Sequence, residues 1–112
     1  MKEKGQILVY GSLTASMEYI LQGNGYGITQ PATGEELEHM LETGESSLLL
    51  FSPESWENLP ENLALLRKLR EKSKLPMLVA FQKSSDEIRI MALNAGADDC
   101  IGPDCSVLEA LA

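Results

Sequence analysis

Residues 77–102 limit what this chain can fold into more than any other stretch, because they predict a strand, a helix and a second strand. Residues 77–81 form a continuous apolar run, which is typical of a strand buried on both faces. Residues 84–95 follow with helical periodicity, and Gly96 stands where a helix commonly ends. The inward face of this helix is predicted to comprise Ile88, Met91, Ala92 and Ala95. A unit of this length predicts two parallel strands joined by a right-handed crossover.

The rest of the chain repeats this alternation. Strands are predicted over 6–10, 26–30, 47–51, 77–81 and 100–101, and helices over 13–22, 35–42, 61–72 and 84–95, with a last helix from 105 or 106. Gly11 and Ser12 can cap the first helix, and Thr33 and Glu36 have the spacing of a capping box. The second strand is the least apolar, which favours a sheet edge. Five strands alternating with five helices predict an α/β, doubly wound parallel sheet with helices on both faces.

Length and charge exclude several classes of protein. The 112 residues are enough for one domain with one core, and aromatic residues make up only 5%, so the core should be aliphatic. A net charge of −8 repels phosphate backbones, so direct nucleic-acid binding by this segment is not expected. The chain has no apolar run long enough for a membrane span and no signal-peptide pattern at its start, so a cytoplasmic location is expected. Two cysteines, Cys100 and Cys105, are too few for a disulfide framework.

The sequence at 92–101 resembles the segment between the fourth helix and the fifth strand of response-regulator receiver domains, the CheY-like family. It reads Ala-Leu-Asn-Ala-Gly-Ala-Asp-Asp-Cys-Ile. Barrel enzymes also use Ala-Gly-Ala-Asp, but a barrel needs about 250 residues, so that alternative requires a fragment. The resemblance covers nearly the whole length in element order. It implies a flavodoxin-like strand order, 2-1-3-4-5, and a single receiver-like domain over 1–112. The chain stops about two turns into its last predicted helix, so we expect either the N-terminal part of a longer regulator or a short last helix.

A typical receiver places its chemistry at the carboxyl ends of the strands, where ligands bind in such sheets. An acidic pair after the first strand helps to hold magnesium, and an aspartate that ends the third strand accepts a phosphoryl group. A hydroxyl residue ends the fourth strand and senses that group, and a lysine ends the fifth strand and pairs with its charge. These residue types fit the chemistry, because a hard dication needs carboxylate oxygens and a transferring phosphoryl group needs cationic stabilisation.

This chain departs from the receiver pattern at every one of those positions. The residues that stand there are Gly11, Ser12, Ser52, Phe81, Gln82 and Gly102. Moving the register by one residue puts Phe51 or Pro53 at the acceptor position, so no slip restores the aspartate. The resemblance therefore implies an atypical receiver, a pseudo-receiver without a phosphoacceptor aspartate, a bound metal or a cofactor. Catalytic residues are not expected either, because the sequence contains no paired catalytic carboxylates, Ser-His-Asp set, phosphate loop or metal-ligand cluster.

Several individual residues have both a functional and a purely structural interpretation. Ser52 could contact an anion but more often such a serine caps a turn, and Glu54 could replace the acceptor or simply be a solvated loop carboxylate. Backbone groups at Gly11 and Ser12 could bind an anion or only cap a helix. Asp98 and Asp99 lie at the wrong end of the fifth strand for catalysis, which favours turn and capping roles. The basic residues 68, 70, 72 and 74 are more typical of a solvated face than of a docking patch.

Two functions compete. The first is a non-catalytic signal-receiver module of a bacterial two-component-type response regulator or transcription regulator, which acts by homodimerisation or by binding a protein partner, with a C-terminal effector domain outside this chain. Receivers commonly pair through a surface that maps to about 85–112 here, with Ile90, Met91, Leu108 and Leu111 as candidates. The alternative is a small-molecule sensor that uses the altered pocket at the strand ends, lined by Phe81, Trp56 and Gln82.

Overall fold

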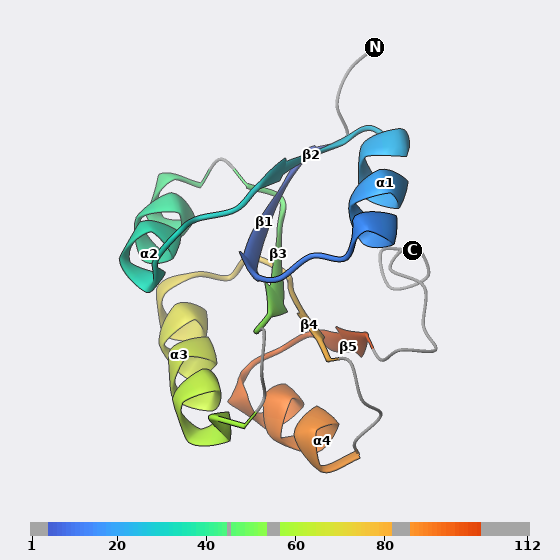
Figure 1. Cartoon of the computed structure of the whole chain (residues 1–112). Coiled ribbons are helices and arrows are strands. Elements are labelled where there is room, and N and C mark those ends of the chain that lie inside the picture. Colours follow the sequence, from blue (N-terminus) through green and yellow to red (C-terminus); the bar gives the residue numbers. More distant parts are fainter. Residues whose placement is uncertain (1–4, 45, 54–56, 82–85, 102–112) are drawn as a thin grey trace.

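The computed structural model describes residues 5–44, 46–53, 57–81 and 86–101, and it contains one parallel five-stranded sheet (Figure 1). The strands are β1 (Gly5–Gly11), β2 (Tyr26–Thr29), β3 (Leu48–Ser52), β4 (Met77–Ala80) and β5 (Asp99–Ile101). Their order is β2-β1-β3-β4-β5, and every neighbouring pair is parallel. The predicted fold class and strand order are therefore confirmed, with β2 at an edge of the sheet.

The described helices cover both faces of the sheet. They are α1 (Ala15–Gly23), α2 (Gly34–Thr43), α3 (Leu59–Lys72) and α4 (Asp86–Ala95). Figure 1 shows α1 on one side of the sheet and α2, α3 and α4 on the other. The predicted last helix from 105 or 106 lies outside the described residues, as do residues 84 and 85 at the predicted start of α4.

The core has two layers because side chains alternate along each strand. Leu8, Leu49 and Phe51 face the layer of α2, α3 and α4 and are fully buried. Ile7, Val9 and their neighbours on β3 and β4 face the layer that includes α1. Both layers are mainly aliphatic, as the composition predicts. Aromatic residues include Phe81 and the pair Tyr10 and Phe51, whose rings stack with centroids 5.0 Å apart.

The helix starts differ from the expectations in two places. Thr14, and not Ser12, caps α1, and its side chain accepts a hydrogen bond from the backbone N–H of Met17 at 3.1 Å. The α3 helix begins at Leu59 rather than at 61, because Pro60 in its first turn already has the backbone angle that a helix needs. The predicted capping pair is present, with Thr33 Oγ1 accepting from Glu36 N–H at 3.1 Å.

Met91 is a third departure from the expectation. The helical face that we assigned to the core includes it, but 39% of Met91 is exposed, whereas Ala92 and Ala95 are buried. Successive residues of a helix are about 100° apart, so the face that buries Ala92 and Ala95 leaves Met91 at its edge. The inward face of α4 is therefore narrower than predicted.

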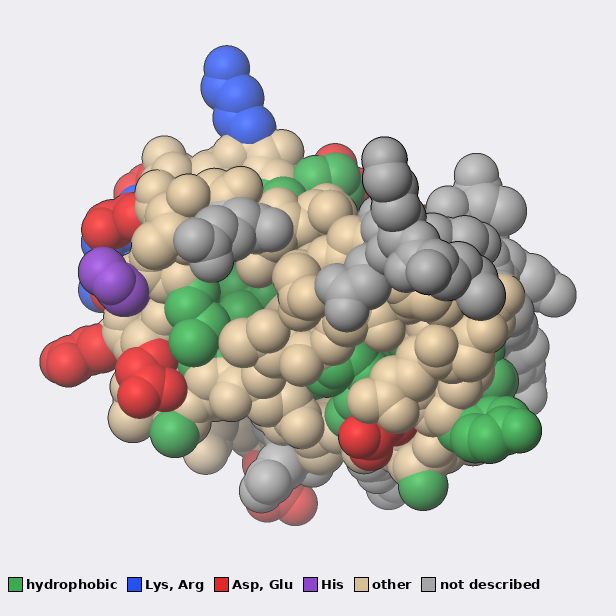
Figure 2. Space-filling view, turned by 90° about the horizontal axis from the view of Figure 1, so that it is seen from above, with side chains coloured by type: hydrophobic (Ala, Val, Ile, Leu, Met, Phe, Trp, Pro, Cys, Tyr) green, Lys and Arg blue, Asp and Glu red, His purple; other side chains and the backbone are tan. Residues whose placement is uncertain are grey.

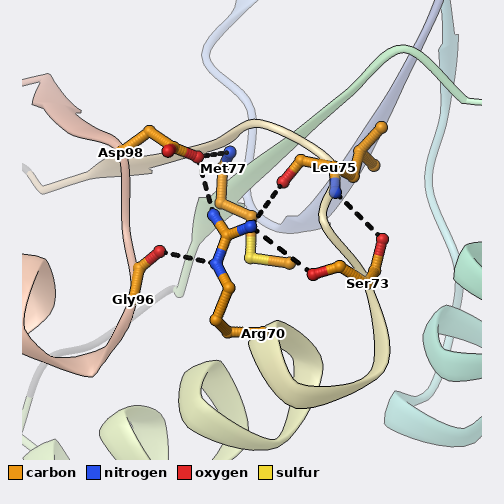
Figure 3. A network of polar contacts seen from close by, with 6 residues as sticks. All are labelled: Arg70, Ser73, Leu75, Met77, Gly96 and Asp98. Carbon is orange, nitrogen blue, oxygen red and sulfur yellow. Dashed lines mark hydrogen bonds and ion pairs between the residues drawn. The ribbon is translucent and has the colours of Figure 1, made fainter.

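Arg70 joins the end of α3 to the turn that precedes β5, in the arrangement of Figure 3. Its guanidinium donates to the backbone oxygens of Gly96 at 2.8 Å and Leu75 at 3.1 Å, and it pairs with Asp98 at 2.6 Å. Gly96 has φ +124°, and a Cβ built there would lie 2.7 Å from Arg70 Cγ. The Ala-Gly-Ala-Asp sequence therefore forms a turn that packs over the side chain of Arg70. The interpretation of position 70 as part of a solvated face is wrong.

Candidate functional site

The ends of β1 and β3 lie side by side at the carboxyl edge of the sheet. Gly11 is the register partner of Ser52, and Ser12 N–H donates to the backbone oxygen of Ser52 at 2.8 Å. The structure therefore brings together the residues that stand at the acidic-pair and acceptor positions of a receiver. Among these three residues no side chain carries a charge.

The backbone closes over Gly11. This residue has φ +95°, which side-chain-bearing residues rarely adopt. A Cβ built on it would lie 2.6 Å from the carbonyl carbon of Ser52 and 2.9 Å from Cα of Pro53, and closer still to the Ser52 oxygen. A carboxylate at position 11 is incompatible with this backbone, because β3 occupies the space that its first side-chain atom would need.

Phe81 follows β4 and packs into the core. Only 8% of it is exposed, it belongs to the hydrophobic layer with α3 and α4, and its N–H donates to Ile101 O at 3.1 Å. Its ring therefore fills the interior beneath the strand ends. The remaining candidates, Gln82, Gly102, Glu54 and Trp56, lie outside the described residues.

The described ranges contain no group of three or more His, Cys, Asp or Glu side chains that could hold a metal ion. Asp98 accepts hydrogen bonds from Arg70 and from Met77 N–H, and Asp99 Oδ1 accepts from Cys100 N–H. Both carboxylates therefore have the structural roles that their position at the start of β5 indicates.

Sequence reasoning missed a pocket of about 460 Å³ beside the ends of β1 and β3. It is lined by Tyr10, Gly11, Pro31, Ala32, Pro53, Asn58, Glu61 and Asn62. These residues come from β1, the β2–α2 connection, the segment after β3 and the first turn of α3, so no single stretch of sequence reveals them. Of the predicted pocket residues, the described lining includes Gly11 but not Phe81.

The α4 helix exposes apolar side chains. Ile90 is 58% exposed, and Leu93 and Met91 are each 39% exposed. Ile90 and Leu93 are three residues apart and therefore neighbours on the helix surface, whereas Met91 lies about 100° from Ile90. Leu93 was not among the predicted surface residues, and its spacing from Ile90 is the feature that could have found it. Leu108 and Leu111 lie outside the described residues.

Glu38 and Cys100 have shifted pKa values. The ammonium of Lys68, 2.9 Å from Glu38 Oε1, is the main cause that lowers the pKa of Glu38, and Lys72 adds to it. This pairing ties α2 to α3. Burial raises the pKa of the Cys100 thiol, which keeps it protonated and unreactive. Cys105 lies outside the described residues, so the structure does not place the two cysteines relative to each other.

The chain is similar in sequence to a bacterial transcriptional regulatory protein. No protein-family model matches it. It is 30% identical over 100 residues to the uncharacterized transcriptional regulatory protein YcbL of Bacillus subtilis (strain 168). This match covers 88% of the chain but only 42% of that relative, so the chain spans about two fifths of its length.

The solved structures that it resembles include receiver domains. One is a CheY-like response regulator receiver domain protein from Methanospirillum hungatei JF-1, with a TM-score of 0.70 and 27% identity over 96% of this chain and 87% of that one. Another is the receiver domain of the TMAO respiratory system response regulator TorR, with a TM-score of 0.67 and 27% identity over 95% and 90% of the two chains. In the part of the chain that the structure describes, no helix is both long and apolar enough to cross a membrane. The strand order and these structural matches show that the chain has the CheY-like flavodoxin fold, and its likeness in sequence and structure supports a response-regulator receiver domain.

Proposed function

We propose that this chain is a non-catalytic signal-receiver module that works without phosphorylation of an aspartate. The observation that carries the proposal is the contact between Gly11 and the backbone of Ser52 and Pro53, which leaves no room for a side chain at the first position of the acidic pair. Ser52 itself offers a hydroxyl where a receiver needs a carboxylate. Without clustered carboxylate oxygens at these two strand ends, a hard dication has little to bind there.

The output is proposed to pass through a protein contact at α4. Ile90 and Leu93 form a small exposed apolar area, with Met91 on the flank of the same helix. A second copy of the chain or another protein domain would bury this area, and Leu108 and Leu111 belong to the same proposal from the sequence. A longer regulator in the cytoplasm, with an effector domain beyond residue 112, would suit such a module, and the similarity to a longer transcriptional regulatory protein supports that context.

The binding of magnesium and beryllofluoride tests the phosphorylation-independent mechanism. The chain has a single tryptophan, Trp56, which follows β3 in the sequence, so intrinsic fluorescence reports on that segment. We expect no saturable response to millimolar magnesium, with or without beryllofluoride. A saturable response would show that other oxygens, such as those of Glu54, rebuild an ion site, and it would overturn the proposal.

A further inference from the structure

The pocket beside Gly11 lies on the side of the sheet that faces α2 and α3. Its volume, about 460 Å³, is within the range of about 300 to 1,000 Å³ that is usual for small-molecule sites. Tyr10 is held in place by stacking on Phe51, and Pro53 is buried, so these walls are preformed. The pocket is open to solvent, and it has the size and two of the fixed walls of a ligand site.

Charge decides which ligands this pocket favours. Among the described lining residues, Glu61 supplies the one charged side chain. The positive end of the α3 dipole, worth roughly half an elementary charge, would attract anions, but the full negative charge of Glu61 in the first turn outweighs it. The chain carries a net charge of −8, and Figure 2 shows acidic side chains at several places around one face. The local and the overall field both favour a cation.

The uncharged walls indicate the body of the ligand. Pro31 is partly exposed and offers apolar surface, and the face of the Tyr10 ring that is not stacked on Phe51 can accept a cation or a flat group. Asn58 is the N-cap of α3 but makes no capping hydrogen bond, because its ψ of 52° is far from the extended backbone of a capping residue. Its amide can therefore serve a ligand as a neutral hydrogen-bonding group.

We propose that this pocket binds a small organic cation with an aromatic body, such as an aryl amidine. The carboxylate of Glu61 pairs with the cationic group, and Tyr10 and Pro31 contact the ring. This inference goes beyond the signalling mechanism proposed above and does not depend on it.

Three probes of the same shape test the proposal with the full 112-residue chain: benzamidine, which is cationic, benzamide, which is neutral, and benzoate, which is anionic. Binding is followed by ¹H–¹⁵N NMR. Benzamidine should cause saturable shifts in the amides of Gly11, Ala32, Asn58, Glu61 and Asn62. Benzamide should bind more weakly, and benzoate should not saturate. The test compares the dissociation constants of the three probes with one another.

Matched variants locate the binding site. Glu61→Gln should weaken benzamidine binding about three- to fivefold, as expected for a partly exposed ion pair. Glu71→Gln removes the same charge from an exposed position at the other end of α3 and should leave the affinity unchanged. Ala32→Tyr fills the pocket from an exposed position and should abolish binding without loss of fold.

Three results would each overturn the proposal. They are an absence of saturable benzamidine binding, an equal affinity for benzoate, and equal weakening by Glu61→Gln and Glu71→Gln. None of these results bears on magnesium or beryllofluoride, so a failure of this inference is distinguishable from a failure of the proposed signalling mechanism.

Discussion

Arg70 and Asp98 form an ion pair at 2.6 Å between the end of α3 and the turn before β5. The same Asp98 oxygen accepts a hydrogen bond from the backbone N–H of Met77, the first residue of β4, at 2.8 Å. One carboxylate therefore connects three elements that are far apart in the sequence. Because 55% of the Asp98 side chain is exposed, water weakens the ion pair and limits what it contributes to stability.

Replacing Asp98 with alanine should lower the free energy of unfolding by about 1 kcal/mol, since a charge-assisted hydrogen bond and a partly exposed ion pair are lost together. Urea unfolding followed by circular dichroism measures this. Asp99→Ala is the matched control, because the Asp99 carboxylate accepts from the N–H of the next residue and so joins no distant elements. Its effect should stay within about 0.5 kcal/mol. Equal losses in the two variants would contradict the role given to Asp98.

Gly11→Ala should destabilise the chain by about 2 kcal/mol or more, because a side chain there meets both a positive φ and the backbone of β3. Gly23→Ala is the control, since a Cβ at the end of α1 would meet nothing within 4 Å. That variant should be neutral or more stable by about 0.5 kcal/mol. Thermal unfolding of both variants measures the difference, and a tolerated Gly11→Ala would remove the main support for a closed acidic-pair position.

Ser52→Asp restores a carboxylate at the acceptor position but not the groups that make it reactive. We expect no phosphoryl adduct after incubation with acetyl phosphate and magnesium, as measured by intact mass spectrometry. The reason is that Gly11 and Ser12 supply no carboxylate for a metal, and Gly102 supplies no cation for the transferring group. A receiver with a complete set of these residues, treated in parallel, is the positive control. A stoichiometric adduct on the introduced carboxylate would mean that the site is only one residue away from function.

The ion pair between Glu38 and Lys68 should make stability depend on pH. The pKa of Glu38 is held below its usual value of 4.5, so the folded state favours the ionised form. This contribution is fully present above pH 4.5 and is lost as the pH falls through the lower folded pKa. The stability difference between the natural chain and Glu38→Gln should therefore shrink below pH 4.5. Chemical denaturation at about pH 7 and about pH 3 measures it, on either side of that range. A difference that grows on acidification would refute the pairing.

The apolar area on α4 should matter for association and not for folding. Ile90→Ser should leave the melting temperature nearly unchanged, because the side chain is 58% exposed, and should weaken self-association or partner binding. Tyr19→Ser is the control, since Tyr19 is an even more exposed apolar residue, at 80%, on a different helix. Sedimentation velocity over a range of concentrations measures the oligomeric state. If the chain stays monomeric and Ile90→Ser does not impair a full-length regulator, the α4 contact is wrong.

The fold was predictable because the strands at 6–10, 47–51 and 77–81 are short apolar runs, and a glycine ends or follows α1, α2 and α4. The runs 47–51 and 77–81 match β3 and β4 within one residue at each end, and Gly44 ends α2 as a left-handed cap. The errors in the element bounds include helix starts, and at α1 two capping candidates compete. Ser12 and Thr14 are both good caps, and only the backbone path after Gly11 decides for Thr14.

The site was less predictable, since its parts come from different loops. Alignment to the receiver pattern placed Gly11 and Ser52 at matching strand ends, and the structure makes them register partners. It did not reveal Tyr10 or Asn58 as pocket residues, because nothing local to either residue indicates that the β2–α2 connection lies opposite. Arg70 was misjudged for the same reason: its main partners, Gly96 and Asp98, are 26 and 28 residues away.

The contact between Gly11 and Ser52 also has a consequence for the energetics of the domain. A cluster of carboxylates at the end of a sheet repels itself, and a folded protein that carries one gives up stability that a bound metal ion restores. At the ends of β1 and β3 this chain has a glycine and two serines instead. These strand ends have no such repulsion to relieve, and they can form the same backbone contact whether the surrounding concentration of divalent cations is high or low.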